Sequence, residues 1–261
     1  MGSEGIVSSG NNPPVPMWMK PLPVVLTLVL WEAVTRLSFL PAYLLPSPEA
    51  VALRLIQTIQ SGVLLQHVAV TLQEVLAGLA LGLAIATALG TLLAKSPVAE
   101  KLLSPYIVAS QSIPTVAIAP LLVIWFGPGK LSKILISSLL VFFPVLVNTM
   151  VGIRSVPEDL HDLMRILKAT RWQVFTRLEL PAAMPVYLGG VRVGATLSVI
   201  GAVVGEFVGA DEGLGFLINV ARGMYDTALV FAAVFVLIAL ALGLYGLVTL
   251  IERRVLSWQS I

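Results

Sequence analysis

The sequence predicts an all-α membrane protein with six transmembrane helices, and three observations lead to this fold class. Of 261 residues, 57% are hydrophobic and only 11% are charged, and the mean hydropathy is +0.96. A water-soluble domain of this length has a far more polar composition. Asp, Glu, Lys and Arg are missing from residues 75–94, 102–129, 134–153 and 227–251. Each run can cross a hydrocarbon core, which needs about 20 helical residues.

Two further apolar segments contain charge. Residues 21–40 contain Glu32 and Arg36, which lie four positions apart and can neutralise each other on one helix face. Among residues 182–204, Arg192 is the only charged residue. Two roles for this arginine stay open, since it can contact an anionic solute or pair with a carboxylate. Glu206 follows this segment and is expected to meet a loop or a docked protein.

The distribution of basic residues predicts that both termini are cytoplasmic. Under this topology ten basic residues lie in cytoplasmic segments: Lys20, Lys95, Lys101, Arg154, Arg165, Lys168, Arg171, Arg177, Arg253 and Arg254. Four lie on the opposite side: Arg54, Lys130, Lys133 and Arg222. Short cytoplasmic segments are enriched in Lys and Arg, so the N-in, C-in orientation follows.

The chain is predicted to form one membrane domain over residues 21–255. Residues 1–20, rich in Gly, Ser, Asn and Pro, form a flexible cytoplasmic tail, and residues 256–261 form a second tail. Pro48 and Gly62 bound a predicted surface helix on the outer side. The glycine-rich stretch before the last span predicts a folded outer loop or a short re-entrant segment.

Two spans contain residues that allow unusual helix geometry. In the second span, Gly78 and Gly82 lie four positions apart, which can let another helix approach closely. The third span contains three prolines beside polar residues, and such a helix either lines a pathway or is kinked and packed. The residues predicted to line a pathway are Gln111, Ser112, Thr115, Asn148, Arg192, Thr196 and Ser198.

Residues 155–181 form a predicted cytoplasmic hairpin of two short amphipathic helices. Ser155 and Glu158 have the spacing of a capping box, with Pro157 in the first turn. The apolar residues Leu160, Leu163, Met164 and Leu167 then form one stripe, and Trp172, Phe175 and Leu178 recur every three residues. Three roles stay open: the hairpin lies in lipid headgroups, packs on its own bundle, or docks into a soluble partner.

The spacing within this hairpin resembles the loop signature of ABC-importer permeases. Asp162 stands at the acid of that signature, Lys168 at its glycine, and Pro181 at its final proline. Leu163 and Met164 replace its two small residues. The segments "SIPTVAIAPLLVIWFG", "LPAAMPVYLGGVRVG" and "GEFVGADEGLGFLI" are also similar to permeases of the nitrate, sulfonate and taurine group, whose relatives include aminopyrimidine and riboflavin importers.

The resemblance implies a type I ABC importer permease subunit in the bacterial inner membrane. It implies two permease copies, two cytoplasmic ATPase subunits and an extracytoplasmic solute-binding protein. The residues expected to contact the ATPase are His161, Asp162, Leu163, Met164, Arg165, Leu167, Lys168, Ala169, Thr170, Arg171 and Trp172. The sequence contains no G-x-x-x-x-G-K-[ST], so ATP and Mg²⁺ are expected in the partner ATPase, and this chain is not expected to be an enzyme or to bind a cofactor.

Rival functions follow from other features of the sequence. An ion-coupled secondary transporter is the main alternative, although it usually has ionisable residues near the membrane midplane. An intramembrane enzyme would need His67 or His161 as its base, and both are predicted to lie outside the spans. No cysteine is present for thiol chemistry, and a net charge of +2 gives no basis for nucleic-acid binding.

Overall fold

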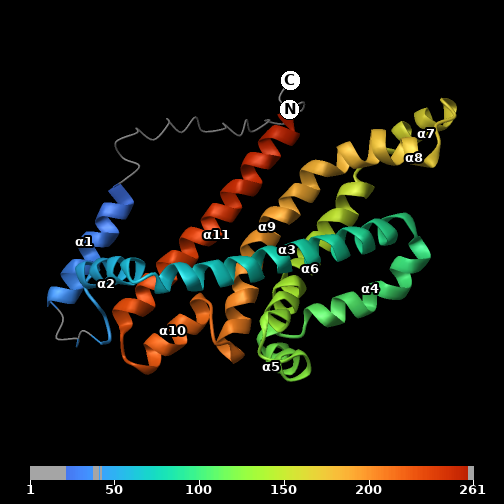
Figure 1. The fold of residues 1–261 in the computed structure, drawn as a ribbon. Helices are drawn as coiled ribbons and strands as arrows, with labels where there is room; N and C mark the ends of the chain where they lie inside the picture. The colour runs from blue at the N-terminus through green and yellow to red at the C-terminus, as the bar shows by residue number, and fades with distance from the viewer. Residues whose placement is uncertain (1–21, 38–40, 42, 258–261) are drawn as a thin grey trace, which may run out of the picture.

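The computed structural model describes residues 22–37, 41 and 43–257, and this part of the chain consists of helices without a strand (Figure 1). The predicted tail 1–20 and residues 258–261 of the second tail lie outside it. The helices are α1 (Leu22–Leu37), α2 (Pro48–Gln60), α3 (Val63–Lys95), α4 (Pro97–Gln111), α5 (Thr115–Phe126), α6 (Lys130–Arg154), α7 (Glu158–Ile166), α8 (Arg171–Val174), the π-helical turn η2 (Phe175–Glu179), α9 (Leu180–Gly209), α10 (Leu214–Gly223) and α11 (Thr227–Val255).

Four helices are long and apolar enough to cross a membrane: α3, α6, the continuous helix Arg171–Gly209 and α11. The pair α4 and α5 raises this number to five if it forms one bent span. The described part of the first predicted span, 21–40, forms α1, which has 16 residues. Glu32 and Arg36 of α1 form the predicted ion pair. The prediction of six spans and its N-in, C-in orientation stay predictions.

The third span was predicted as one helix over residues 102–129, and this prediction was wrong. The chain instead bends by 95° between α4 and α5. Pro114 has no N–H to continue the first helix, and it adopts an extended conformation as the residue that precedes α5. Pro105 and Pro120 stay inside α4 and α5 without ending them. The polar residues predicted beside the middle proline therefore lie at a sharp corner of the chain.

Helices α3, α6 and α9 pack together closely at the centre of the bundle (Figure 1). The close approach depends on glycines, because a Cβ atom built on Gly82 of α3 would lie 2.8 Å from Cβ of Val141 on α6. A Cβ atom on Gly205 of α9 would likewise lie 2.9 Å from Cγ of Lys133 on α6. The prediction that Gly78 and Gly82 permit a close helix contact is confirmed.

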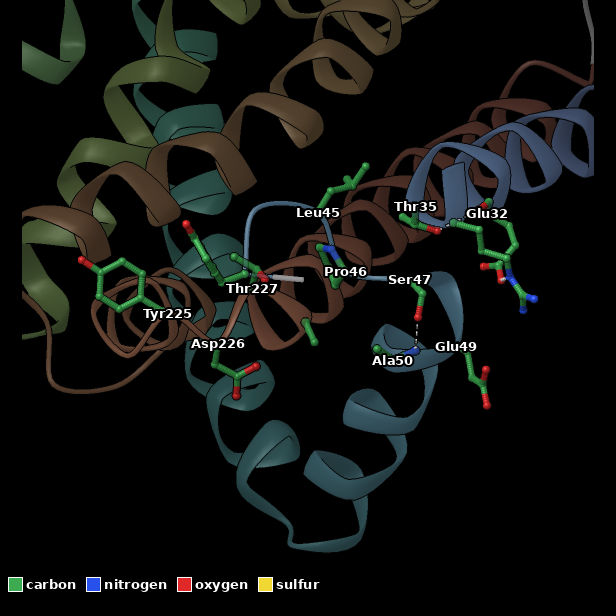
Figure 2. Close-up of a pocket in the computed structure, with 13 residues that line it drawn as sticks. Glu32, Thr35, Leu45, Pro46, Ser47, Glu49, Ala50, Tyr225, Asp226 and Thr227 are labelled. Atoms are coloured by element: carbon green, nitrogen blue, oxygen red, sulfur yellow. Dashed lines mark hydrogen bonds and ion pairs between the residues drawn. The ribbon is translucent and has the colours of Figure 1, made fainter. Parts of the chain in front are cut away.

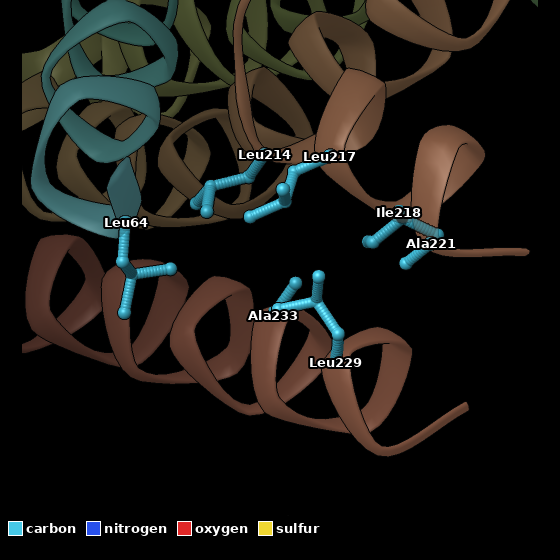
Figure 3. Packing of buried hydrophobic residues seen from close by; sticks show 7 residues of the cluster. All are labelled: Leu64, Leu214, Leu217, Ile218, Ala221, Leu229 and Ala233. Carbon is cyan, nitrogen blue, oxygen red and sulfur yellow. The ribbon is translucent and has the colours of Figure 1, made fainter. Parts of the chain in front are cut away.

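A separate apolar cluster anchors the segment between α9 and α11 (Figure 3). Helix α10 inserts one face against α11 and the start of α3. The cluster consists of Leu64, Leu214, Leu217, Ile218, Ala221, Leu229 and Ala233. The glycine-rich stretch predicted as a folded outer segment is thus a short helix with its own buried contacts.

Helix α2 confirms the helix predicted between Pro48 and Gly62, whereas its position along the outer side of the membrane stays a prediction. Ser47 caps it by accepting a hydrogen bond from the backbone N–H of Ala50 at 3.2 Å. The next helix begins after Gly62, whose φ of 77° lies in the left-handed region that favours glycine. Arg54 pairs with Asp226 at 2.7 Å and so connects α2 to the start of α11.

The two ends of the bundle differ in shape. Helices α7 and α8 extend outward at the end where α11 finishes, whereas α5 and α10 lie at the opposite end (Figure 1). Under the predicted topology, the end with α7 and α8 faces the cytoplasm. We call the end of the bundle that contains α5 and α10 the outer end.

Candidate coupling segment and transmembrane sites

The hairpin predicted from the sequence forms a segment that exposes apolar side chains. Helix α7 has no buried residue and makes no extensive contact with another described helix. Ile166 is 78% exposed, Leu167 66% and Trp172 71%. Leu163 is also exposed, whereas Met164 and His161 are half-buried. We refer to residues 158–174, which comprise α7, α8 and their connection, as the coupling segment.

The start of α7 differs from the predicted capping box. Ser155 donates its hydroxyl hydrogen bond back to the carbonyl of Gly152 at 2.8 Å. Helix α7 begins at Glu158, and Pro157 occupies the N-cap position without a side-chain cap. The prediction failed because α6 continues to Arg154 and leaves Ser155 at its own C-terminal end.

The turn between α7 and α8 shows why the loop signature of ABC-importer permeases has a glycine at the position of Lys168. Lys168 occupies that position and has a φ of 50°, in the left-handed region. The N–H of Lys168 donates to the carbonyl of Arg165 at 2.9 Å, and the N–H of Ala169 donates to that of Met164 at 3.0 Å. This pair of bonds is a Schellman motif, which glycine usually terminates. Lys168 therefore keeps the turn at a cost in backbone strain.

A capping box does occur in the segment, at the start of α8. The Thr170 hydroxyl accepts from the N–H of Gln173 at 3.3 Å, and the Gln173 side chain accepts from the N–H of Thr170 at 2.8 Å. These reciprocal bonds fix the direction in which α8 leaves the turn. The T-x-x-Q spacing of Thr170 and Gln173 is the sequence signal for this box, which the predictions above do not include.

A π-helical turn connects the coupling segment to α9. In η2, Glu179 forms an ion pair with Lys95 of α3 at 2.6 Å. The same ammonium lies 4.4 Å from the ring centroid of Phe175, and that ring lies 5.9 Å from the ring of Trp172. The coupling segment is therefore linked both to α9, through the chain, and to α3, through Lys95.

Charged residues of the coupling segment also form a local contact. Asp162 accepts a hydrogen bond from Arg165 at 2.7 Å, and both side chains are exposed. Lys168, Thr170 and Arg171 are exposed, and Ala169 is half-buried. The sequence analysis did not select Ile166, which falls off the predicted apolar stripe, although it is the most exposed apolar residue of α7. Its exposure agrees with the rest of α7, which has no buried residue.

The residues predicted to line a pathway do not gather at one place in this conformation. Gln111 and Ser112 are exposed at the bend between α4 and α5, and Thr115 is half-exposed beside them. Asn148 donates to the carbonyl of Pro144 at 2.8 Å on its own helix. Three residues of α9 complete the set: Arg192 and Thr196, which are half-buried, and Ser198, which is fully buried.

Ser198 contributes to the contact between α9 and α6. Its hydroxyl donates to the carbonyl of Ala195 at 2.8 Å, and its own carbonyl accepts from the hydroxyl of Ser137 at 2.9 Å. Thr196 likewise donates to its own helix, at the carbonyl of Val193. Both hydroxyls are thus engaged by the backbone within the membrane domain.

Arg192 forms an ion pair with Glu252 of α11. Its guanidinium carbon also lies 5.6 Å from the ring centroid of Tyr245. Of the two roles that the sequence left open for Arg192, the geometry in this conformation corresponds to pairing with a carboxylate.

Three charged residues that the sequence analysis did not associate are buried together near the outer end. Glu74 of α3, Lys133 of α6 and Glu206 of α9 are all almost fully buried. The Lys133 ammonium donates to the carbonyls of Pro128, Gly129 and Gly209. The sequence counts Lys133 among the basic residues of the outer side, and in the structure it lies in the first turn of α6 with its side chain buried.

Glu206 organises the connection that precedes α10. Its carboxylate accepts hydrogen bonds from the Thr71 hydroxyl at 2.7 Å and from the N–H of Gly215. Thr71 in turn accepts from the N–H of Leu214 at 2.8 Å. His67 accepts from the N–H of Gly213 through Nδ1 at 2.9 Å. Glu206 therefore meets a loop, one of the two outcomes expected, and it does so inside the bundle.

An open pocket of about 530 Å³ lies between α1, the start of α2 and the turn before α11 (Figure 2). Tyr43 and Tyr225 from two sides of this pocket approach edge to face, with ring centroids 6.4 Å apart. Tyr225 has a φ of 57°, so the turn before α11 holds a non-glycine residue in the left-handed region. Trp31 of α1 stacks on Phe231 of α11 at 5.6 Å.

Comparison with known protein families decides the identity of this fold. Residues 78–257 match the family model of the binding-protein-dependent transport system inner membrane component. The chain belongs to this family. It is therefore a multi-pass permease subunit of an ABC transporter, and the matched region contains the coupling segment and the helices α4 to α11.

Individual relatives of this family resemble nearly the whole chain. The chain is 48% identical over 240 residues to a riboflavin transport system permease protein of Chloroflexus aurantiacus, covering 92% of this chain and 90% of the relative. It is 37% identical over 236 residues to a formylaminopyrimidine transport permease protein of Halalkalibacterium halodurans, covering 90% and 94%.

A solved structure supports the same fold. The chain aligns with a TM-score of 0.66 to a chain of the MetNI methionine ABC transporter in an inward-facing conformation. The alignment covers 75% of this chain and 97% of that chain at 19% sequence identity. At this identity the likeness supports the architecture of the helices alone.

Proposed function

We propose that the chain is one of two identical permease subunits in an ATP-driven importer, and that residues 161–172 dock into a separate ATPase subunit. The observation that carries this proposal is the exposed apolar surface formed by Ile166, Leu167 and Trp172. Large apolar side chains on a short helix are typical anchors in the groove of a partner protein. Closed two-fold dimers are the commonest assembly, which favours two identical copies.

The charge of α7 argues against the other roles of the segment. Helices that lie in lipid headgroups usually present Lys and Arg to anionic lipids. Helix α7 instead contains Glu158, Asp159 and Asp162 against one arginine, Arg165. Packing on its own bundle is disfavoured too, since no residue of α7 is buried. Over the whole coupling segment these acids are balanced by Arg165, Lys168 and Arg171, so the segment lacks the net positive charge of a lipid-surface helix, and a protein partner accounts for its exposed apolar side chains.

The connections of the coupling segment support a mechanical role. The chain leads from α8 through η2 into α9, and Lys95 holds Glu179 of η2 against α3. A displacement of the segment by the ATPase would thus act on two central helices at once. Rigid-body rotation of packed helices is one recurring way in which transporters change their access. The candidate pathway residues at the bend, Gln111, Ser112 and Thr115, would change their surroundings in that rotation.

The solute is proposed to be a small nitrogen heterocycle. Two relatives whose alignments cover about nine tenths of this chain are named for the transport of riboflavin and formylaminopyrimidine. Sulfonates and taurine, the solutes of more distant members, are the second candidates. The solute itself is expected to be selected mainly by the extracytoplasmic binding protein.

The assembly is tested by purifying the tagged chain in mild detergent and weighing the intact complex by native mass spectrometry. Two permease copies with two copies of a P-loop ATPase are the expected result. A single chain without an ATPase, together with uptake that survives ATP depletion and collapses with the ion gradient, would establish the secondary transporter instead. A binding protein that co-purifies can be screened by thermal shift with riboflavin, a pyrimidine and taurine.

A further inference from the structure

A pocket of about 170 Å³ lies between the three central helices, at the end of the bundle that bears the coupling segment. Helix α3 contributes Thr87 and Thr91 from its last turns, α6 contributes Ile153 near its end, and α9 contributes Met184 and Tyr187 from its start. None of the residues predicted to line a pathway borders it. The pocket therefore lies inside one permease subunit, apart from the candidate pathway residues.

The two residues that close the π-helical turn η2 also line this pocket. The N–H of Leu180 donates to the carbonyl of Phe175, five positions earlier, and both side chains border the pocket. π-Helical turns are rare, and they occur frequently at functional sites. The position of η2 beside the pocket therefore indicates a ligand site independently of the volume of the pocket.

The helices around the pocket are otherwise in close contact. A Cβ atom built on Gly90 of α3 would lie 2.8 Å from Cβ of Thr149 on α6, and one built on Gly152 would lie 2.9 Å from the carbonyl oxygen of Ala183 on α9. Thr149 and Ala183 both line the pocket. Protein interiors contain few voids larger than a water molecule, so a space of this size among tightly packed helices is suited to an occupant.

The lining combines aromatic rings with hydroxyl groups. Phe175 and Tyr187 contribute the rings, and the hydroxyl of Thr87 donates to that of Tyr187 at 3.2 Å. This bond uses one of the two hydroxyl hydrogens, so the pair can still donate to a ligand. Thr91 is half-buried, and its hydroxyl forms no hydrogen bond to another described residue. No charged side chain of the described residues lines the pocket, which favours a neutral ligand.

The volume limits this ligand to one ring. An apolar cavity of about 150 Å³ holds one benzene molecule, and this pocket has about 170 Å³. We infer that the pocket binds a neutral six-membered heteroaromatic ring, such as an aminopyrimidine, which hydrogen-bonds to the hydroxyls of Tyr187 and Thr91. The choice of a nitrogen heterocycle rests on the proposed function, whereas the pocket and its hydroxyls do not.

A bound ring would connect the coupling segment more firmly to the central helices. It would contact Phe175, whose ring centroid lies 4.4 Å from the ammonium of Lys95 and 5.9 Å from the ring of Trp172. Lys95 also pairs with Glu179 of η2. Occupation of the pocket would thus hold η2 in place and resist a displacement of the coupling segment.

The test follows the thermal unfolding of the purified permease complex in detergent with increasing concentrations of 4-aminopyrimidine. We expect a saturable stabilisation of the wild type. Tyr187→Phe keeps the ring and removes the hydroxyl, and it should weaken the binding about fivefold, as for the loss of one neutral hydrogen bond. Tyr106→Phe is the matched control, because Tyr106 is exposed on α4 and does not line the pocket.

A second variant fills the pocket instead of changing its chemistry. Thr91→Phe should abolish the stabilisation by 4-aminopyrimidine, and it decides the test if Tyr187→Phe is too unstable to measure. Hydrogen exchange of the Leu180 amide, which closes η2, provides a local measurement. This exchange should slow when the wild type binds the ring and stay unchanged in Thr91→Phe.

Benzene and phospholipid separate the other possible occupants. Equal stabilisation by benzene and 4-aminopyrimidine, without an effect of Tyr187→Phe, would overturn the heteroaromatic ligand. Stabilisation that disappears when phospholipid is added would assign the pocket to an acyl chain and overturn the proposal as well. Equal behaviour of wild type and Thr91→Phe would overturn the site itself. None of these outcomes measures transport, so the proposed import function is tested separately by the subunits that co-purify.

Discussion

Arg192 on α9 and Glu252 on α11, which lie 60 positions apart in the sequence, form an ion pair that joins the two helices. Both side chains are partly buried, and Tyr245 lies beside the guanidinium. The pair neutralises an arginine that the sequence alone places in an apolar span. In this conformation, Arg192 therefore holds α11 against the central helices.

The first prediction concerns this pair. Arg192→Gln leaves the Glu252 carboxylate without its cationic partner, and we expect the complex to lose about 1–3 kcal/mol of stability, the usual cost of an unsatisfied charged group. The exchange Arg192→Glu with Glu252→Arg should restore most of this loss. Thermal unfolding of the wild type and the two variants in detergent measures both effects. An unstable exchange variant, or a single variant as stable as wild type, would show that the pair does not hold α11.

The sequence predicted those elements whose signals are local. The charge-free runs located α6 and α11 and most of α3, and Pro48 with Gly62 bounded α2, because helix signals depend on neighbours within one or two turns. The coupling segment was also located from spacing alone. Its helix start was misplaced, because the role of Ser155 depends on where the preceding helix ends.

The buried charges near the outer end could not be predicted in this way. Glu74 and Lys133 each border a charge-free run, and the sequence gives no signal for the direction in which either side chain points. Whether such a residue turns inward depends on the register in which α3, α6 and α9 pack, and that is a long-range property. The bend of 95° between α4 and α5 is similar, because a proline indicates a break but does not fix its angle.

The second prediction tests the exposed apolar surface of the coupling segment. Leu167→Asp places a charge on a side chain that we propose to be buried in the ATPase. We expect the affinity of the permease for its ATPase to fall by about tenfold or more, as for truncation of an anchor residue. Uptake should fall in parallel, whereas the stability of the permease itself should not change, since Leu167 is exposed.

A matched change separates docking from a general effect of added charge. Val98 is also exposed, and it lies in the first turn of α4 near the same end of the bundle. We expect Val98→Asp to retain ATPase binding, as measured by co-purification at a series of salt concentrations. Equal losses for Leu167→Asp and Val98→Asp would contradict a specific role for the coupling segment.

The third prediction uses the strained turn at Lys168. Lys168→Gly removes the strain of the left-handed backbone conformation and should stabilise the folded segment by about 1 kcal/mol. Lys168→Val should have the opposite effect, because a β-branched residue tolerates this conformation poorly. Hydrogen exchange of the amides of Lys168 and Ala169, which close the Schellman motif, measures the change locally. Faster exchange in Lys168→Gly would contradict the strain.

The fourth prediction compares two glycines in helices. A Cβ atom on Gly82 would lie 2.8 Å from Cβ of Val141 and 2.9 Å from the carbonyl oxygen of Ser138, so Gly82→Ala must separate α3 from α6. Overpacking of this kind costs about 1–3 kcal/mol.

Gly243 of α11 provides the matched control for the same substitution, since a Cβ atom there meets no atom within 4 Å. Gly243→Ala should change the stability by no more than about 0.5 kcal/mol. Thermal unfolding of both variants under identical detergent conditions makes the comparison. Equal stability of the two would mean that α3 and α6 can move apart freely, and the close glycine contact would then not determine how these helices pack.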